Sequence, residues 1–142
     1  MPEQAQQVHL ALELASEAVE DLTPLVYARL FAAHPDMEPL FWRDTNHQIK
    51  GEMLSQVFRA ILDFVGDRQY AARLIQCEVV THAGYDVPPE VFRVFFGTVR
   101  DTLREVIAGN WTPDMDTAWS KLLTDLDYYV LNTDQSQTVD AA

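Results

Sequence analysis

The chain of 142 residues is 48% hydrophobic and 23% charged, which fits one globular domain over residues 1–142 with a core of about 8–132. A formal net charge of −12 argues against nucleic acid and anionic membranes as partners, because both attract basic surfaces. The single cysteine, Cys77, excludes a disulfide framework, and no apolar run has the length of a membrane span. The N-terminus lacks a basic and apolar leader, so we expect a soluble protein of the cytoplasm.

The first half of the chain predicts three helices. Apolar residues at every fourth position predict an amphipathic first helix with the inner face Leu10, Leu14, Ala18 and Leu22. Thr23 and Pro24 are the expected N-cap and first residue of a second helix, which Pro35 interrupts. A short turn then carries Phe41, and after a polar connector a strong apolar pattern predicts a third helix over 48–65.

The second half continues the helical pattern to residue 130. One helix has on its inner side Tyr70, Leu74, Ile75, Val79 and His82. A long helix is expected to start at Pro88-Pro89-Glu90 and run past Ile107, and Thr112-Pro113 cap the last helix. Six or seven helices with short, proline-marked connections predict an all-α fold of crossing helices, followed by a flexible acidic tail over 134–142.

His82 carries the clearest chemical signal. It shares one helical face with Val79, three residues earlier. Gly84 lets the chain turn away directly afterwards, and Val87 and Phe92 follow where they can touch the edge of a flat ring held by the histidine. A histidine on an apolar face is more often a core residue than a ligand, but these neighbours favour an imidazole that binds the iron of a planar cofactor.

Two aromatic residues in the first half are further candidates. Tyr27 lies in an otherwise apolar helix with Phe31 one turn on. It is either a core tyrosine or a hydrogen-bond donor that stabilises the partial negative charge of dioxygen held in a dry pocket. Phe41 is either a core anchor or a ring that stacks on the planar cofactor, and both readings need it to be buried.

The helix over 48–65 is expected to form the opposite wall of the pocket, and two registers fit. In the first, Ile49 lies over the iron and the residues facing inward are Met53, Leu54 and Val57. In the second, Gly51 marks a close crossing with the second helix, Lys50 lies over the iron, and the residues facing inward are Leu54 and Phe58. His47 comes too early to face the iron in either register and is expected at the pocket mouth.

Together these residues resemble the globin family, and most closely single-domain bacterial globins and the haem domain of flavohaemoglobins. The match covers Leu10 to Val130, and its strongest parts are the segments 27–41 and 82–92, followed by Trp119. The resemblance implies a globin fold around haem b, with His82 similar to the proximal iron ligand and Tyr27 to the distal tyrosine. It implies as haem contacts Phe41, His47, Lys50, Leu54, Phe58, Val79, Val87, Phe92 and Phe95.

Three departures from the family pattern matter. Ile49 or Lys50 stands where relatives have a distal glutamine or histidine; an apolar residue leaves Tyr27 as the main donor, whereas a lysine should swing to the haem propionates. Phe92 stands where flavohaemoglobin-like members have a tyrosine that belongs to a proximal hydrogen-bond network with a glutamate, so a more ordinary imidazole is expected. No flavin or nicotinamide domain follows the last helix, so electrons would come from a separate reductase.

The resemblance implies reversible binding of dioxygen, or of NO or CO, at a five-coordinate haem b in a monomer or homodimer. An alternative is a nitric oxide dioxygenase served by a separate reductase, against which Phe92 and the missing reductase domain count. A third is a haem-free globin-like sensor or interaction domain, and the intact proximal histidine argues against it.

Overall fold

The computed structural model describes residues 2–41, 48–84, 87 and 89–131. These residues form seven α-helices, two short 3-10 helices and no strand, which confirms the predicted all-α fold of six to seven helices. The α-helices are α1 (Pro2–Ala18), α2 (Thr23–Ala33), α3 (Gln48–Val65), α4 (Ala71–Ala83), α5 (Pro89–Phe92), α6 (Val94–Ile107) and α7 (Pro113–Leu131). The 3-10 helices are η1 (Pro35–Phe41) and η2 (Ala108–Asn110).

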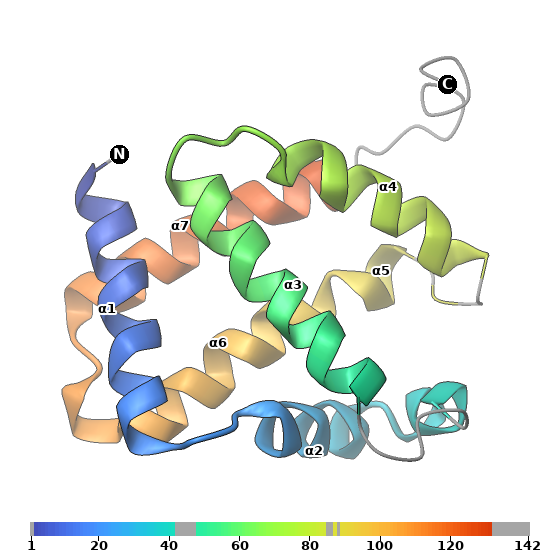
Figure 1. Ribbon diagram of the computed structural model, residues 1–142, viewed down its shortest axis with the longest axis horizontal. Helices are drawn as coiled ribbons and strands as arrows, with labels where there is room; N and C mark the ends of the chain where they lie inside the picture. The colour runs from blue at the N-terminus through green and yellow to red at the C-terminus, as the bar shows by residue number, and fades with distance from the viewer. Residues whose placement is uncertain (1, 42–47, 85–86, 88, 132–142) are drawn as a thin grey trace.

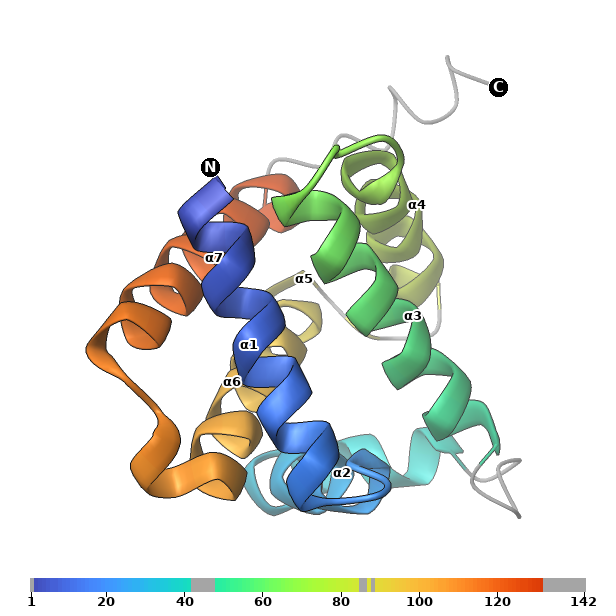
Figure 2. The same ribbon diagram turned by 60° about the vertical axis from the view of Figure 1, so that its left-hand side comes forward.

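The helices cross one another rather than form a parallel bundle. In the view of Figure 1, α3 passes in front of α6, and α2 lies across the lower end of both. Figure 2 shows α1 in front of α6 and beside α7, and α1 packs on both of these helices. The large side chains that are fully buried in the core are Trp119, Phe64, Ile61, Leu103, Met115, Leu122 and Leu126. These large side chains come from α3, α6 and α7, and the core continues to buried residues of α1, α2 and α4.

The inner face of α1 differs from the predicted one. The structure buries Val8, Ala11 and Ala15 completely, whereas Leu10 is 40% exposed and Ala18 is also exposed. Both sets of residues have helical spacing, so the spacing could not choose between them. The small alanine side chains allow α1 to lie closely against α6 and α7, and this packing decides which face turns inward.

The predicted long helix after His82 is divided into two. Pro89 begins α5, and a turn at Arg93 separates it from α6. The Phe96 N–H donates to the Arg93 carbonyl three residues earlier, at 3.3 Å, so the chain makes one tight 3-10 bond at this point instead of continuing the α-helix. The predicted starting residue, Pro88, lies outside the described residues, as do His47 and the predicted tail over 134–142.

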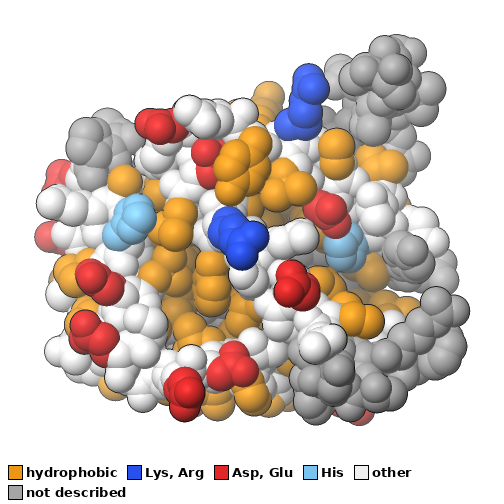
Figure 3. Space-filling model, viewed as in Figure 1, with side chains coloured by type: hydrophobic (Ala, Val, Ile, Leu, Met, Phe, Trp, Pro, Cys, Tyr) orange, Lys and Arg blue, Asp and Glu red, His pale blue; other side chains and the backbone are white. Residues whose placement is uncertain are grey.

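The surface reflects the negative charge of the chain. Acidic side chains gather at the lower left of the face in Figure 3, over α1 and its connection to α2. Exposed acidic residues of that segment are Glu13, Glu17, Glu20 and Asp21. Among the described helices, none is both long enough and apolar enough to cross a membrane.

Candidate functional site

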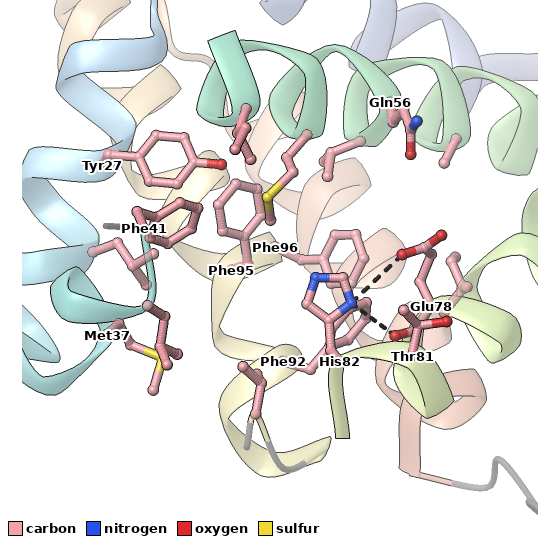
Figure 4. Close-up of a pocket in the computed structure, with 18 of the residues that line it drawn as sticks. Tyr27, Met37, Phe41, Gln56, Glu78, Thr81, His82, Phe92, Phe95 and Phe96 are labelled. Atoms are coloured by element: carbon pink, nitrogen blue, oxygen red, sulfur yellow. Dashed lines mark hydrogen bonds and ion pairs between the residues drawn. The ribbon is translucent and has the colours of Figure 1, made fainter. Parts of the chain in front are cut away.

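A large cavity lies on the side of the fold formed by α2, α3, α4 and α5. Its volume is about 720 Å³, within the range of about 300–1,000 Å³ that is usual for cofactor and ligand sites. Most of its lining is aliphatic or aromatic, and Figure 4 shows Tyr27 and Phe41 on one side of it and His82 on the other. The polar side chains in the lining are those of Tyr27, Gln56, Glu78, Thr81 and His82.

The His82 imidazole is held in one orientation by its own helix. Its Nδ1 lies 2.8 Å from the backbone carbonyl oxygen of Glu78, one turn earlier in α4. Because a carbonyl oxygen can only accept, Nδ1 carries the hydrogen of this bond, and Nε2 is left with a lone pair. In Figure 4 the Nε2 side of the ring is turned away from Glu78 toward the middle of the cavity. This is the arrangement in which a histidine can bind a metal.

The start of α4 is anchored by a carboxylate from the end of α3. Asp63 accepts the backbone N–H groups of Gln69, Tyr70 and Ala71, at 3.1, 3.0 and 2.8 Å. Partial loss of hydration raises the pKa of Asp63, whereas the three hydrogen bonds lower it. The hydrogen bonds have the larger combined effect, so the pKa lies below its ordinary value of 3.8. Tyr70 was placed on the inner side by the sequence pattern, and this was wrong, because its side chain is 47% exposed at the helix start.

The turn after His82 does not depend on a left-handed glycine. Gly84 has a φ of −67°, which any residue adopts, and a Cβ added there would meet the Thr81 carbonyl oxygen at 3.3 Å. The glycine therefore relieves a close contact. The chain is turned instead by the Val87 N–H, which donates to the His82 carbonyl at 2.9 Å and brings Val87 into the lining of the cavity.

Phe92 contacts His82 directly. The two ring centroids are 5.0 Å apart with an angle of 68° between the planes, and Phe96 continues the contact at 6.0 Å from Phe92. A phenylalanine packs on the imidazole in this way but has no hydroxyl with which to form a hydrogen bond. The tyrosine network expected in flavohaemoglobin-like relatives therefore has no counterpart at this position.

Tyr27 is buried at the opposite side of the cavity, with 2% of its surface exposed. Its hydroxyl donates to the Lys50 backbone carbonyl in the first turn of α3, at 3.3 Å. Its ring packs at 5.5 Å on the rings of both Phe41 and Phe95, and all three residues line the cavity. The phenol is thus fixed by packing, while its hydrogen bond to the backbone is longer than the usual 2.5–3.0 Å of a hydroxyl donor.

The orientation of α3 separates the two predicted registers. Ile49, Met53 and Val57 line the cavity, as the first register expects for these three residues. Leu54 and Phe58 line a separate cavity of about 250 Å³ beside the connection between α1 and α2. A Cβ added at Gly51 would meet no atom within 4 Å, so no close helix crossing occurs there.

Lys50 is likewise not among the residues that line the large cavity. Its ammonium nitrogen lies 5.2 Å from the centroid of the Phe41 ring, in cation–π range. Lys50, Leu54, Phe58 and Val79 are absent from the lining of the large cavity, although the resemblance implies them as cofactor contacts, and Val79 is buried in the core instead. His47 cannot be placed, since it lies outside the described residues.

The structure brings together most of the residues singled out from the sequence. The large cavity is lined by Tyr27, Phe41, Ile49, His82, Val87, Phe92 and Phe95. The sequence reasoning missed Met37, Gln56, Glu78 and Thr81, which also line it. Glu78 could have been found from its spacing, because a carboxylate four residues before a histidine shares its helical face. Gln56 could have been found only if the register of α3 had been known.

The fold and the cavity define an all-α protein with an apolar pocket and one inward-facing imidazole. The sequence model of the globin family matches residues 25–128, which is well over half of the chain, and the chain belongs to the globin family. No curated protein and no solved structure matches the chain significantly. Globins are in general haem-binding proteins that bind diatomic gases through the haem iron.

Proposed function

We propose that this globin holds haem b through His82 and reversibly binds dioxygen, or another diatomic gas such as NO or CO. The observation that carries the proposal is that Nδ1 of His82 is held by the Glu78 carbonyl, so that the Nε2 side of the ring is turned into an apolar cavity of about 720 Å³. A planar aromatic cofactor fits the lining, in which the rings of Phe41, Phe92 and Phe95 are available for stacking and edge contacts.

The haem iron supplies one open coordination position at which a diatomic gas binds. The chain's own residues set the surroundings of that position. Ile49 and Met53 contribute apolar side chains that exclude water, and Tyr27 is the donor for a polarised gas molecule. To donate a hydrogen bond into the cavity, the Tyr27 hydroxyl must break its bond to the Lys50 carbonyl oxygen. At 3.3 Å this bond is long and therefore weak. Lys50, beside Phe41, is the cation we expect to meet a haem propionate.

A flavohaemoglobin-like subtype is part of the proposal, and it rests on Tyr27. Nitric oxide dioxygenation is the second candidate function, and it needs electrons from a reductase. The exposed acidic residues over α1 and its connection to α2 favour it, because a basic donor protein would be attracted to that face.

The test is an absorption spectrum of the purified protein in its ferric, ferrous and carbonyl forms. A Soret band with a five-coordinate ferrous spectrum is the expected result. Fast NO consumption with an added reductase would favour the dioxygenase over reversible binding. A protein that takes up no haem, even after mixing with haemin, would contradict the proposal and leave the haem-free sensor or interaction domain.

A further inference from the structure

Glu78 presents two oxygen atoms to one nitrogen of His82. Its backbone carbonyl oxygen lies 2.8 Å from Nδ1, and its carboxylate Oε2 lies 3.5 Å from the same atom. Figure 4 shows both interactions converging on the side of the ring that faces away from the cavity centre. The Nδ1–H is therefore bonded to a neutral carbonyl oxygen and has a negatively charged carboxylate beside it.

The two acceptors differ in what they do to the ring. The carbonyl oxygen makes the shorter contact and so fixes the tautomer and the orientation of the imidazole. The carboxylate adds a negative charge on the Nδ1 side, and a charge there increases the electron density that Nε2 can donate to a metal. The side chains of Glu78 and His82 are 36% and 24% exposed, so solvent screens this interaction only in part.

The Glu78 carboxylate has few other groups to interact with. Among the described residues, His82 is the only basic side chain with which the structure pairs it. Phe92, on the other side of the imidazole, contributes no hydrogen-bonding atom. The electrostatic surroundings of Nδ1 are thus set by a residue of the histidine's own helix.

We propose that Glu78 is a positioning residue for His82, and that its carboxylate makes the imidazole a stronger electron donor to the haem iron. The proposal rests on haem binding by His82. From Phe92 alone we would expect an ordinary imidazole, because the tyrosine and glutamate network is missing. In this proposal the negative charge comes instead from Glu78, one turn earlier in α4. A more electron-rich imidazole favours the ferric over the ferrous state.

The test compares the full-length haem protein with Glu78→Gln, which keeps the size and the backbone carbonyl but removes the charge. Glu78→Ala is the second variant, and alanine preserves the helix. Glu52→Gln is the matched control, because Glu52 is an exposed residue of α3 outside the cavity lining and loses the same charge. The measurements are the iron–histidine stretching band in the resonance Raman spectrum of the ferrous protein and the ferric/ferrous midpoint potential.

We expect the stretching band to move to lower wavenumber and the midpoint potential to rise in both Glu78 variants, with neither change in Glu52→Gln. A purely structural role of Glu78 would alter haem retention without moving these two values. A band and a potential equal to those of the wild type in both haem-loaded Glu78 variants would overturn the proposal. A wild-type protein without haem would instead overturn the proposed function, so the two failures are distinguishable.

Discussion

The two walls of the cavity are built from different kinds of contact. On the His82 wall, formed by α4 and α5, the histidine interacts with Glu78, Val87 and Phe92, which all lie within ten residues of it. On the Tyr27 wall, formed by α2 and α3, the tyrosine bonds to Lys50, 23 residues away, and packs on Phe95 of α6. The contacts of the His82 wall therefore come from one short segment of the chain, whereas those of the Tyr27 wall depend on how separate helices cross.

This difference between the two walls explains why the sequence predicted the lining residues of one wall better than those of the other. The spacing of Val87 and Phe92 after His82 led to residues that do line the cavity. For α3 the spacing allowed two registers, and the packing of the helix placed Met53 and Leu54, which are neighbours in the chain, in two different cavities. Adjacent residues on a helix point about 100° apart, so a small rotation of the helix changes which one faces a ligand.

The largest expected effect tests the His82 wall. We predict that His82→Ala loses haem or holds it only weakly, because the metal-facing nitrogen is removed and alanine offers no ligand. The measurement is the Soret absorbance per mole of purified protein. His9→Ala, at an exposed position of α1, is the control and should keep the wild-type band. An unchanged Soret spectrum in His82→Ala would mean that another residue binds the iron.

The next prediction separates the two neighbours on α3. Leu54 is 2% exposed, so Leu54→Ala should lower the free energy of unfolding by about 2–5 kcal/mol while leaving CO association unchanged. Met53→Ala should do the reverse: it should change the CO association rate with a smaller loss of stability, because Met53 is only half-buried and lines the large cavity. Urea unfolding and flash photolysis measure the two quantities. A Leu54→Ala protein with altered CO kinetics would mean that Leu54 faces the large cavity, contrary to the orientation of α3 in the structure.

The Tyr27 wall should respond more modestly to the loss of its hydroxyl. Tyr27→Phe keeps the ring packing and removes one hydrogen bond, worth about 0.5–1.5 kcal/mol. Dioxygen release should therefore become about 2- to 12-fold faster in a stopped-flow measurement. Tyr128→Phe, at a position on α7 that is 63% exposed, is the control and should release dioxygen at the wild-type rate. Equal rates in the two variants would assign the donor role to a different residue.

The smallest expected effect concerns the anchor of α4. The pKa of Asp63 is lower in the folded protein than in the unfolded chain, so its ionised form stabilises the fold. This contribution is complete above the ordinary value of 3.8 and is lost as the pH falls through the lower folded pKa. Asp63→Asn should be less stable than the wild type at pH 7, and the difference should shrink below that value.

The measurement for Asp63 is the urea unfolding free energy as a function of pH. Asp67→Asn, one turn further at an exposed position, is the control and should follow the wild type at each pH. A difference between Asp63→Asn and the wild type that persists undiminished in acid would mean that the negative charge does not anchor α4.

The sequence by itself determined the helical class, the presence of an iron-binding imidazole as a hypothesis, and most of the aromatic residues around it. Those features depend on local spacing, which a linear chain displays directly. Only the tertiary structure decided that α1 buries Val8, Ala11 and Ala15, that Leu54 and Phe58 leave the large cavity, and that Asp63 anchors α4. For α1 and α3 several faces satisfied the same spacing, and close packing against other helices allowed only one. The Asp63 bonds depend on the conformation of the turn between α3 and α4, which helical spacing does not reveal.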